Sequence, residues 1–321
     1  MAALSDAAFP RLVDLRQLRS EDLEALLDEE SDEWQRTLDW DFRGSAELVQ
    51  RFVALHSLTG YALVNANRVV GYIYYVCEER KGLIGDLYVS QRFRTEEAED
   101  QLLTPVLETL AGASWVKRIE SQLMMLSNQF ERVLPFADKA VAFPRTFMEA
   151  RLDRVGALPP KARDIAVNYY SWTDRCQEEA ARVIAEAYRG HIDSNINDQY
   201  RTVSGARRFL SNIVQYPGCG TFFQPASLIA LDASGRACGI CLSSLVQHEV
   251  GHITQICVTP SVRGRGVGYE LLRQSMTELR RHGCRKASLT VTSANDHAIE
   301  LYESVGFKTK RTFAAYVWDG L

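Results

Sequence analysis

The sequence predicts an α/β fold made of two tandem domains, and three observations lead to this prediction. The 321 residues suffice for two hydrophobic cores at the usual ~100–200 residues per domain. In the second half, short runs typical of β-strands alternate with segments of helical periodicity. The first half repeats this order more faintly, which indicates two copies of one fold.

The domain boundary is predicted at residues 155–162, which contain Pro159 and Pro160. Two adjacent prolines continue neither a helix nor a central strand. We therefore expect a first domain at 1–154, a linker at 155–162 and a second domain at 163–321.

The two halves carry different net charges. Residues 1–161 hold 19 Lys/Arg and 26 Asp/Glu, a balance of −7, and residues 162–321 hold 18 and 15, a balance of +3, which together give the net charge of −4. No strongly basic stripe interleaved with aromatic residues is present, so nucleic acid is not an expected partner. No run reaches the ~18 apolar residues of a membrane helix, and the N-terminus does not resemble a secretory signal.

The seven cysteines favour a reducing, cytoplasmic environment, because their number is odd and one alone lies in the first half. Cys238 and Cys241 form a CxxC pair on a predicted strand, where side chains three apart point to opposite faces. A zinc site needs about four ligands, and no second CxxC is present. We expect buried structural thiols and no metal.

The second half is expected to continue with a helix after Asp174, which would cap it together with Gln177. A strong helix with apolar residues at helical spacing is expected to end at Gly283. The expected strands are 165–172, 227–231, 237–246, 251–258, 286–292 and 307–317, and the expected helices are 174–188, 204–215, 267–282 and 296–305.

In the first half, the spacing from Asp86 to Arg94 equals the spacing from Gln255 to Arg263 in the second. This match aligns the two predicted copies at one strand end. The expected strands of the first half are 61–65, 69–77, 83–89 and 116–125, and the expected helix is 97–111.

A glycine-rich loop in the second half is the strongest chemical feature. Its three glycines lack Cβ atoms, so a ligand could approach bare amides at a helix N-terminus, where the dipole favours an anion such as a pyrophosphate. Its two arginines add positive charge. A tight strand-to-helix turn is the alternative interpretation. The loop has neither the Walker nor the Rossmann spacing. It reads Arg263-Gly264-Arg265-Gly266-Val267-Gly268.

This loop resembles the acyl-CoA-binding motif R/Q-x-x-G-x-G/A of the GNAT (Gcn5-related N-acetyltransferase) superfamily. A second stretch, Asn295 to Phe307, is similar to the family's N-x-x-A-x-x-L-Y-E-x-x-G-F pattern. The resemblance covers about residues 163–321. It implies two tandem GNAT-like domains, each a mixed, mostly antiparallel, splayed sheet flanked by helices, with a degenerate N-terminal copy.

The resemblance also implies a cofactor site. The pantetheine arm of acetyl-CoA would pair with the strand that ends in Ile256, Cys257 and Val258, and the amides of the first and last of these would hold it and polarise the acetyl carbonyl. The Arg263–Gly268 loop would hold the pyrophosphate. Asn295 would contact the cofactor, and Tyr302 would protonate the departing thiolate.

The chemistry of acetyl transfer agrees with these roles. A preorganised N–H stabilises the oxyanion that amine attack creates, and tyrosine is still protonated at neutral pH. The amine must lose a proton, and His252 and Glu249 are the predicted bases, the latter through water. Strand alternation would place His252 on the face of Thr254, Ile256 and Val258 unless a bulge intervenes.

The aligned loop of the first half has lost the glycines. Glu97 and Glu99 stand where the second half has Gly266 and Gly268, and negative charges there would repel a pyrophosphate. We expect residues 1–154 to bind no acyl-CoA, and to shape the acceptor cleft, support the fold or mediate homodimerisation. The acidic stretch 21–41, with two tryptophans, could attract a cationic amine, although such a run is more often a solvated helix face.

The expected function is an acetyl-CoA-dependent N-acetyltransferase that acts by direct attack of a primary amine in a ternary complex. The alternative is a non-catalytic acyl-CoA-binding or regulatory module with the same fold. A pure binder needs no proton donor, so Tyr302 favours the enzyme. The acceptor is not readable, because the segments expected to line its site, 190–200 and 219–226, carry no diagnostic motif.

Overall fold

The computed structural model describes residues 10–160, 165–216 and 218–321, which form two compact units. The first unit comprises the chain up to Gln35, Phe42–Phe143 and Phe313–Leu321, and the second comprises Arg36–Asp41 and Pro144–Thr312. Within the described part of the chain, no helix is both long and apolar enough to cross a membrane.

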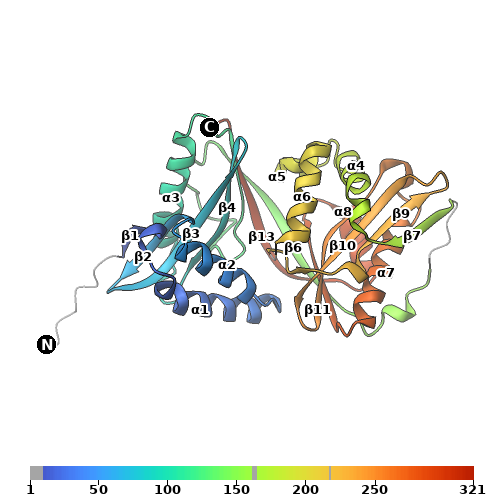
Figure 1. Ribbon diagram of the computed structural model, residues 1–321, viewed down its shortest axis with the longest axis horizontal. Helices are drawn as coiled ribbons and strands as arrows, with labels where there is room; N and C mark the ends of the chain where they lie inside the picture. The colour runs from blue at the N-terminus through green and yellow to red at the C-terminus, as the bar shows by residue number, and fades with distance from the viewer. Residues whose placement is uncertain (1–9, 161–164, 217) are drawn as a thin grey trace. The chain divides into compact units, whose positions relative to one another are not determined.

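The first unit is a mixed sheet with helices packed on it (Figure 1). Its strands lie in the order β1-β2-β3-β4-β5-β13, and the pairs are antiparallel except β4 with β5, which is parallel. The elements are β1 (Arg11–Asp14), α1 (Ser20–Leu38), α2 (Arg43–Ala54), β2 (Thr59–Asn65), β3 (Arg68–Glu78), β4 (Lys81–Val89), α3 (Glu96–Gly112), β5 (Arg118–Gln122) and the end of β13 (Lys308–Asp319).

The second unit has the strand order β6-β12-β11-β10-β9-β7, with β8 beside β10 and a parallel pair between β11 and β12. One apolar cluster joins its sheet to α7 and α8, and another joins it to α4 and α6. The elements are β6 (Ala140–Arg151), β7 (Val167–Ser171), α4 (Gln177–Ala187), α5 (Asp193–Ile196), α6 (Val203–Gln215), β8 (Thr221–Phe222), β9 (Leu228–Asp232), β10 (Ala237–Gln247), β11 (Val250–Val258), α7 (Val267–Arg281), β12 (Lys286–Thr292) and α8 (Asp296–Ser304).

Each unit includes a strand from across the boundary expected at 155–162. The end of β13 pairs with β5 and adds Ala314, Tyr316 and Trp318 to the core of the first unit. Strand β6 pairs with β12 and adds Met148 and Ala150 to the core of the second. The division therefore falls after Phe143 and again after Thr312, which differs from the boundary expected at 155–162. Residues 161 and 162 of that expected linker lie outside the described residues.

The two units repeat one structural detail. Strand β4 bulges at Gly85, because Tyr74 pairs with Asp86 and Tyr75 pairs with Ile84. Strand β11 bulges at the equivalent residue, Thr254, because the paired residues there skip from Ile253 to Gln255. A bulge is specific to its position in a strand, so two bulges at aligned positions support two copies of one fold.

Close packing between sheet and helix repeats as well. A Cβ built on Gly82 would lie 2.7 Å from a methyl carbon of Leu110 in α3. A Cβ built on Gly251 would lie 2.6 Å from a methyl carbon of Leu279 in α7. Both helices thus approach the same point of their sheets over a glycine.

The predicted fold class, an α/β protein with mixed, mostly antiparallel sheets flanked by helices, is confirmed. The sequence reading missed β1, α2, β6, β8 and the short α5, and it gave no bounds for α1. The predicted capping by Asp174 is wrong, because Asp174–Cys176 form a 3₁₀ turn and Cys176 precedes α4 without a side-chain cap. The acidic stretch 21–41 is not simply a solvated face, since Glu30, Trp34 and Trp40 are buried.

Candidate functional site

The sheet of the second unit opens beside the end of β11. Strands β11 and β12 pair from Val250 with Lys286 as far as Ile253 with Leu289, and the pairing stops there although both strands continue. Beyond the Thr254 bulge, β11 still pairs with β10 as far as Val258. The other edge of its last residues is therefore not covered by β12, which matches the splayed sheet that the family resemblance implies.

The bulge changes which side chains share a face. Ile253, Ile256 and Val258 all pack in the cluster around α7, and Cys257 packs in the cluster around α4 and α6. His252 therefore does not share a face with Ile256 and Val258, as it would in a strand without a bulge, because the extra residue at Thr254 shifts the alternation. Burial raises the pKa of the Cys257 thiol to about 12.

The predicted pyrophosphate loop forms a helix N-terminus with uncapped amides. Gly264 and Gly266 have φ of +73° and +78°, a left-handed backbone that glycine adopts readily. Gly266 is the N-cap of α7 and gives no side-chain hydrogen bond, so the first-turn amides point outward unpaired by a cap. Arg263 donates to the carbonyl of Ala187 at the end of α4, at 2.5 Å, and so ties the loop to that helix.

Tyr302 lies on α8 and is buried against Phe307. Burial raises the pKa of Tyr302 well above its usual value, and the nearby Cys241 and Asp193 raise it further. The hydroxyl therefore keeps its proton at neutral pH. Asn295 caps α8 by accepting from the amide of Ala298 at 3.4 Å, while its amide nitrogen lies 3.4 Å from His191 Nε2.

His252, one predicted base, is enclosed in the sheet. Its ring lies between Trp40 and Phe147, at centroid distances of 5.0 and 6.2 Å, and its Nδ1 is 2.9 Å from Ser288 Oγ. Burial lowers the pKa of His252 to about 3. A group with such a pKa is a weak proton acceptor at neutral pH. These surroundings weigh against His252 as the base.

Glu249, the other predicted base, lies in the turn before β11 and is paired with Arg285 at 3.1 Å. Seven residues separate it from Ile256, which is about 23 Å along a strand at ~3.3 Å per residue. A single water does not bridge that length. Glu249 therefore stands at the wrong end of β11 for proton transfer at the predicted cofactor site.

Sequence reasoning missed a polar cluster where β11 and β12 stop pairing. Asp193 accepts from the hydroxyl of Thr292, at the end of β12, and from Arg145 of β6 at 3.4 Å. Arg145 also donates to Thr292 at 2.7 Å. His191 Nδ1 lies 3.8 Å from the carboxylate of Asp193 and 3.2 Å from its amide nitrogen. The H-x-D spacing within segment 190–200 is the signal that could have found this pair.

An aromatic wall adjoins the cluster. Tyr188 stacks on Tyr200 at 4.5 Å and meets His191 edge to face at 5.3 Å. Gln255 donates to the Tyr188 hydroxyl at 2.8 Å and accepts from Tyr200 at 3.3 Å. The residue that follows the β11 bulge is thus tied to the segment expected to line the acceptor site.

In the first unit, the equivalent helix N-terminus is already capped. Thr95 accepts from the amide of Ala98 at 3.2 Å at the start of α3. The amide of Glu97 and the hydroxyl of Thr95 hold the pKa of the Glu97 carboxyl below its usual value. A protein carboxylate therefore occupies the position that a phosphate would need.

Glu99 closes the same place from the inside. Its carboxylate accepts from the amide and hydroxyl of Ser127, at 3.0 and 2.9 Å, and pairs with Arg132. Arg132 is fully buried and also pairs with Asp100. The glutamates that replace the glycines thus have structural partners in this unit.

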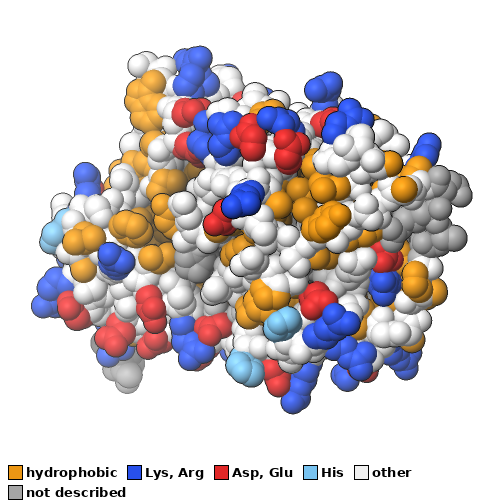
Figure 2. Space-filling model, turned by 45° about the vertical axis from the view of Figure 1, so that its right-hand side comes forward, with side chains coloured by type: hydrophobic (Ala, Val, Ile, Leu, Met, Phe, Trp, Pro, Cys, Tyr) orange, Lys and Arg blue, Asp and Glu red, His pale blue; other side chains and the backbone are white. Residues whose placement is uncertain are grey.

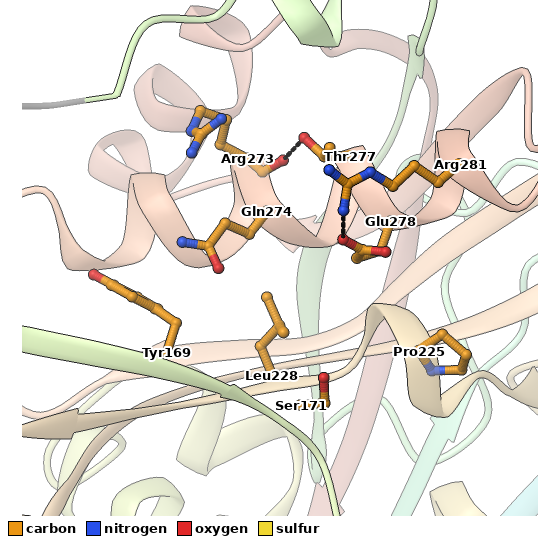
Figure 3. Close-up of a pocket in the computed structure, with 9 residues that line it drawn as sticks. All are labelled: Tyr169, Ser171, Pro225, Leu228, Arg273, Gln274, Thr277, Glu278 and Arg281. Atoms are coloured by element: carbon orange, nitrogen blue, oxygen red, sulfur yellow. Dashed lines mark hydrogen bonds and ion pairs between the residues drawn. The ribbon is translucent and has the colours of Figure 1, made fainter.

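A cavity of about 490 Å³ lies elsewhere in the second unit, between α7 and strands β7 and β9 (Figure 3). Its arginines are paired within α7: Arg281 with Glu278, and Arg273 with Glu270, both at 2.6 Å. Pro225 comes from segment 219–226, and none of the predicted cofactor residues lines the cavity.

The thiols and the surface charges add two observations. Cys238 and Cys241 are buried free thiols, and both pack in the cluster around α7. The expectation that they point to opposite faces of the strand is therefore wrong, because the pairing of β10 with β9 is irregular at Cys238. Among the described residues, no group of three or more His, Cys, Asp or Glu is arranged to hold a metal ion.

Acidic and basic side chains are interspersed over the face in Figure 2.

Comparison with known proteins identifies the family. Residues 195–307 match the model of the acetyltransferase (GNAT) family, and solved GNAT structures align with nearly the whole chain. The matched residues, which lie in the second unit, therefore carry a GNAT domain. One such structure, a GCN5-related N-acetyltransferase from Sphaerobacter thermophilus, has a TM-score of 0.69 at 19% identity and covers 99% of this chain and 97% of that one.

A tandem GNAT protein from the clavulanic acid biosynthesis pathway is also similar in fold. It has a TM-score of 0.62 at 16% identity and covers 97% of this chain and 99% of that chain. At these identities the likeness concerns the fold.

Curated relatives are named acetyltransferases. A mycothiol acetyltransferase from Acidimicrobium ferrooxidans is 26% identical over 277 residues, which are 82% of this chain and 83% of that protein. An uncharacterized N-acetyltransferase from Methanocaldococcus jannaschii is 29% identical over 99 residues, which are 31% of this chain and 41% of that protein. A mycothiol acetyltransferase from Thermomonospora curvata is 33% identical over 86 residues, which are 27% of this chain and 29% of that protein. The last two matches thus span less than half of those proteins.

Proposed function

We propose that the second unit transfers the acetyl group of acetyl-CoA to a primary amine by direct attack in a ternary complex. The observation that carries the proposal is the N-terminus of α7, which has no side-chain cap, together with the left-handed Gly264 and Gly266 before it; a Cβ built on Gly264 would meet no atom within 4 Å. The family and the names of the relatives support acetyl transfer.

In this proposal, the Arg263–Gly268 loop binds the pyrophosphate through the first-turn amides of α7. The residues from Ile256 to Val258 supply backbone groups to the pantetheine arm along the edge that β12 leaves uncovered. One of their amides stabilises the oxyanion that forms when the amine attacks the thioester carbonyl.

Tyr302 completes the reaction. When the tetrahedral intermediate collapses, the C–S bond breaks and the CoA thiolate takes the proton of the Tyr302 hydroxyl. The tyrosinate regains a proton from the newly acylated nitrogen, directly or through water. The raised pKa of Tyr302 keeps the donor protonated before each turnover.

The proposed function is tested by CoA release from acetyl-CoA in the presence of a panel of amines. The panel includes amine-bearing thiols, because several relatives are named mycothiol acetyltransferases. Tyr302→Phe should lower turnover while leaving the acetyl-CoA Kd nearly unchanged. Tyr316→Phe, which removes a buried hydroxyl from the core of the first unit, is the control and should keep turnover. An intact protein that binds no acetyl-CoA would refute the proposal.

A further inference from the structure

Arg145 carries a hydrogen-bond donor that its described neighbours do not satisfy. It lies on β6 opposite Thr292 of β12, at the end of β12 that no longer pairs with β11. Both of its hydrogen bonds to described residues come from Nη1, which donates to Thr292 Oγ1 at 2.7 Å and to Asp193 Oδ1 at 3.4 Å. Its Nε is buried and, within the described part of the chain, has no acceptor. A buried donor without an acceptor costs free energy, so this group calls for a partner.

The ion pair between Arg145 and Asp193 uses only part of the guanidinium. Their contact at 3.4 Å involves one nitrogen, whereas a guanidinium and a carboxylate in full contact form two parallel hydrogen bonds of about 2.7–2.9 Å. The Asp193 oxygen in this contact also accepts from the Thr292 hydroxyl. The edge of Arg145 formed by Nε and Nη2 takes no part in these bonds, and 14% of the side chain is accessible. The guanidinium therefore keeps capacity for a further anionic partner.

The charge of Arg145 acts on the predicted reaction centre. Burial is the largest cause that raises the pKa of Tyr200 and of Tyr302; Asp193 raises both further, and Arg145 lowers both. The two tyrosines pack in different apolar clusters of the unit, one with α4 and α6 and the other with α7 and α8. A charge that acts on both lies between the clusters. An acceptor bound beside Tyr302, the predicted proton donor, therefore lies within the field of the guanidinium.

We propose that Arg145 binds a carboxylate of the acceptor, so that the acceptor is a primary amine that also carries a carboxylate, as amino acids do. This inference rests on the proposed function and narrows its substrate class. A guanidinium stays charged and offers its Nε and Nη2 protons to the two oxygens of one carboxylate. Because Nε is covered by protein atoms, contact through both nitrogens requires the side chain to turn. Contact through Nη2 alone still gives one charge-assisted hydrogen bond.

A carboxylate suits this place better than a phosphate. Asp193 lies beside the guanidinium and repels a second anion, and a phosphate monoester carries about 1.5–2 negative charges at neutral pH, whereas a carboxylate carries one. The phosphates of CoA have their own predicted site at the N-terminus of α7. The ammonium group of the acceptor is attracted by Asp193, so an acceptor with both charges complements the pair as a whole.

The test compares CoA release for matched acceptors in full-length wild type and variants. Each amino acid of a panel, from glycine and β-alanine to the standard α-amino acids, is paired with its carboxamide, which keeps the amine and removes the carboxylate. The carboxamide also has a less basic amine, so the ratio of the two kcat/KM values is compared between proteins. Arg145→Gln should lower kcat/KM for the carboxylate acceptor by about 10–100-fold, the usual loss of a charged hydrogen bond, and for the carboxamide by less than about threefold.

Two variants separate substrate binding from a structural role. Arg145→Lys keeps the positive charge beside Asp193 and loses the planar fork, so it should fold and keep part of the carboxylate preference. Arg151→Gln, at an exposed arginine of the same strand, is the control and should match wild type. If Arg145 only tied Asp193 to β12, Arg145→Gln would lower kcat/KM equally for both members of a pair. That result would overturn the inference, as would a loss of acetyl-CoA affinity as large as the loss of kcat/KM.

The outcomes also separate this inference from the proposed function. If wild type binds no acetyl-CoA or acetylates no amine, the proposed function fails and the inference fails with it. If wild type acetylates amines but all of them lack a carboxylate, or if Arg145→Gln leaves the ratio within each pair unchanged, the inference alone fails. A higher kcat/KM for 2-aminoethylphosphonate than for β-alanine would likewise contradict a carboxylate site.

Discussion

Replacing Gly266 by glutamate would reproduce in the second unit the residue that the first unit carries as Glu97. The added carboxylate would stand at the N-cap of α7, next to the predicted pyrophosphate. Two phosphate charges at about 5 Å in a water-exposed loop each repel it by ~0.8 kcal/mol, since the energy is about 332/(80 × 5). Together they amount to about 1.7 kcal/mol, which corresponds to a Kd about 17-fold weaker.

The matched control is Gly283→Glu at the other end of α7. Gly283 also has a positive φ, +92°, so both variants carry the same charge and a similar backbone strain of about 1–2 kcal/mol. Calorimetric titration with CoA at low salt should show the loss in Gly266→Glu alone, and the loss should shrink as salt rises. Equal weakening in both variants, or unchanged binding in Gly266→Glu, would refute the assignment of the loop.

Three further predictions concern stability, measured by urea unfolding. Burial raises the pKa of the Glu30 carboxyl well above its usual value, and Asp86 adds to the rise, so the folded protein holds a proton there and its free energy of unfolding falls as pH rises above about 4.3. Glu30→Gln should reduce this dependence of stability on pH, whereas Glu24→Gln, at an exposed position of the same helix, should keep it. The same pH dependence in both variants would contradict the reasoning. Arg132→Met should cost about 3–5 kcal/mol by leaving buried Glu99 uncompensated, and adding Glu99→Gln should recover part of it; a cost below about 1 kcal/mol would be inconsistent with the buried pair. Gly82→Ala and Gly251→Ala should each cost about 1–3 kcal/mol, because each new Cβ would meet a leucine methyl at under 3 Å, and a neutral effect at one site alone would argue against equivalent packing.

The sequence predicts elements well where local signals decide them. Helix α7 was expected at 267–282 and spans Val267–Arg281, because Leu271, Leu272 and Met276 repeat at helical spacing and are fully buried. Strand β6 was missed because Pro144 interrupts it and its exposed first residues carry no alternation. Its place beside β12 depends on pairing far along the chain, which no local pattern encodes.

For the candidate site too, features set by local sequence were predicted and features set by strand pairing were not. The glycines of the Arg263–Gly268 loop were readable because their left-handed conformation restricts the residue type. The bulge at Thr254 could not be predicted from the sequence, since it depends on the register of β11 with β10. That one extra residue places Ile256 and Val258 on the face of Ile253, so the face that strict alternation would give His252 in common with them is lost for a physical reason.

The aligned bulges at Gly85 and Thr254 separate what the fold needs from what the chemistry needs. Both units keep the bulge, the parallel strand pair that ends before it and the helix that follows. At the helix N-terminus they differ: the second unit leaves the amides of α7 uncapped, and the first binds them with Thr95 and Glu97. Because Glu99 of α3 also pairs with Arg132 and Ser127, replacing it by glycine would remove structural contacts along with the repulsion. We therefore expect Glu97→Gly and Glu99→Gly together to destabilise the first unit without creating an acyl-CoA site there, which calorimetric titration of the double variant with CoA would check.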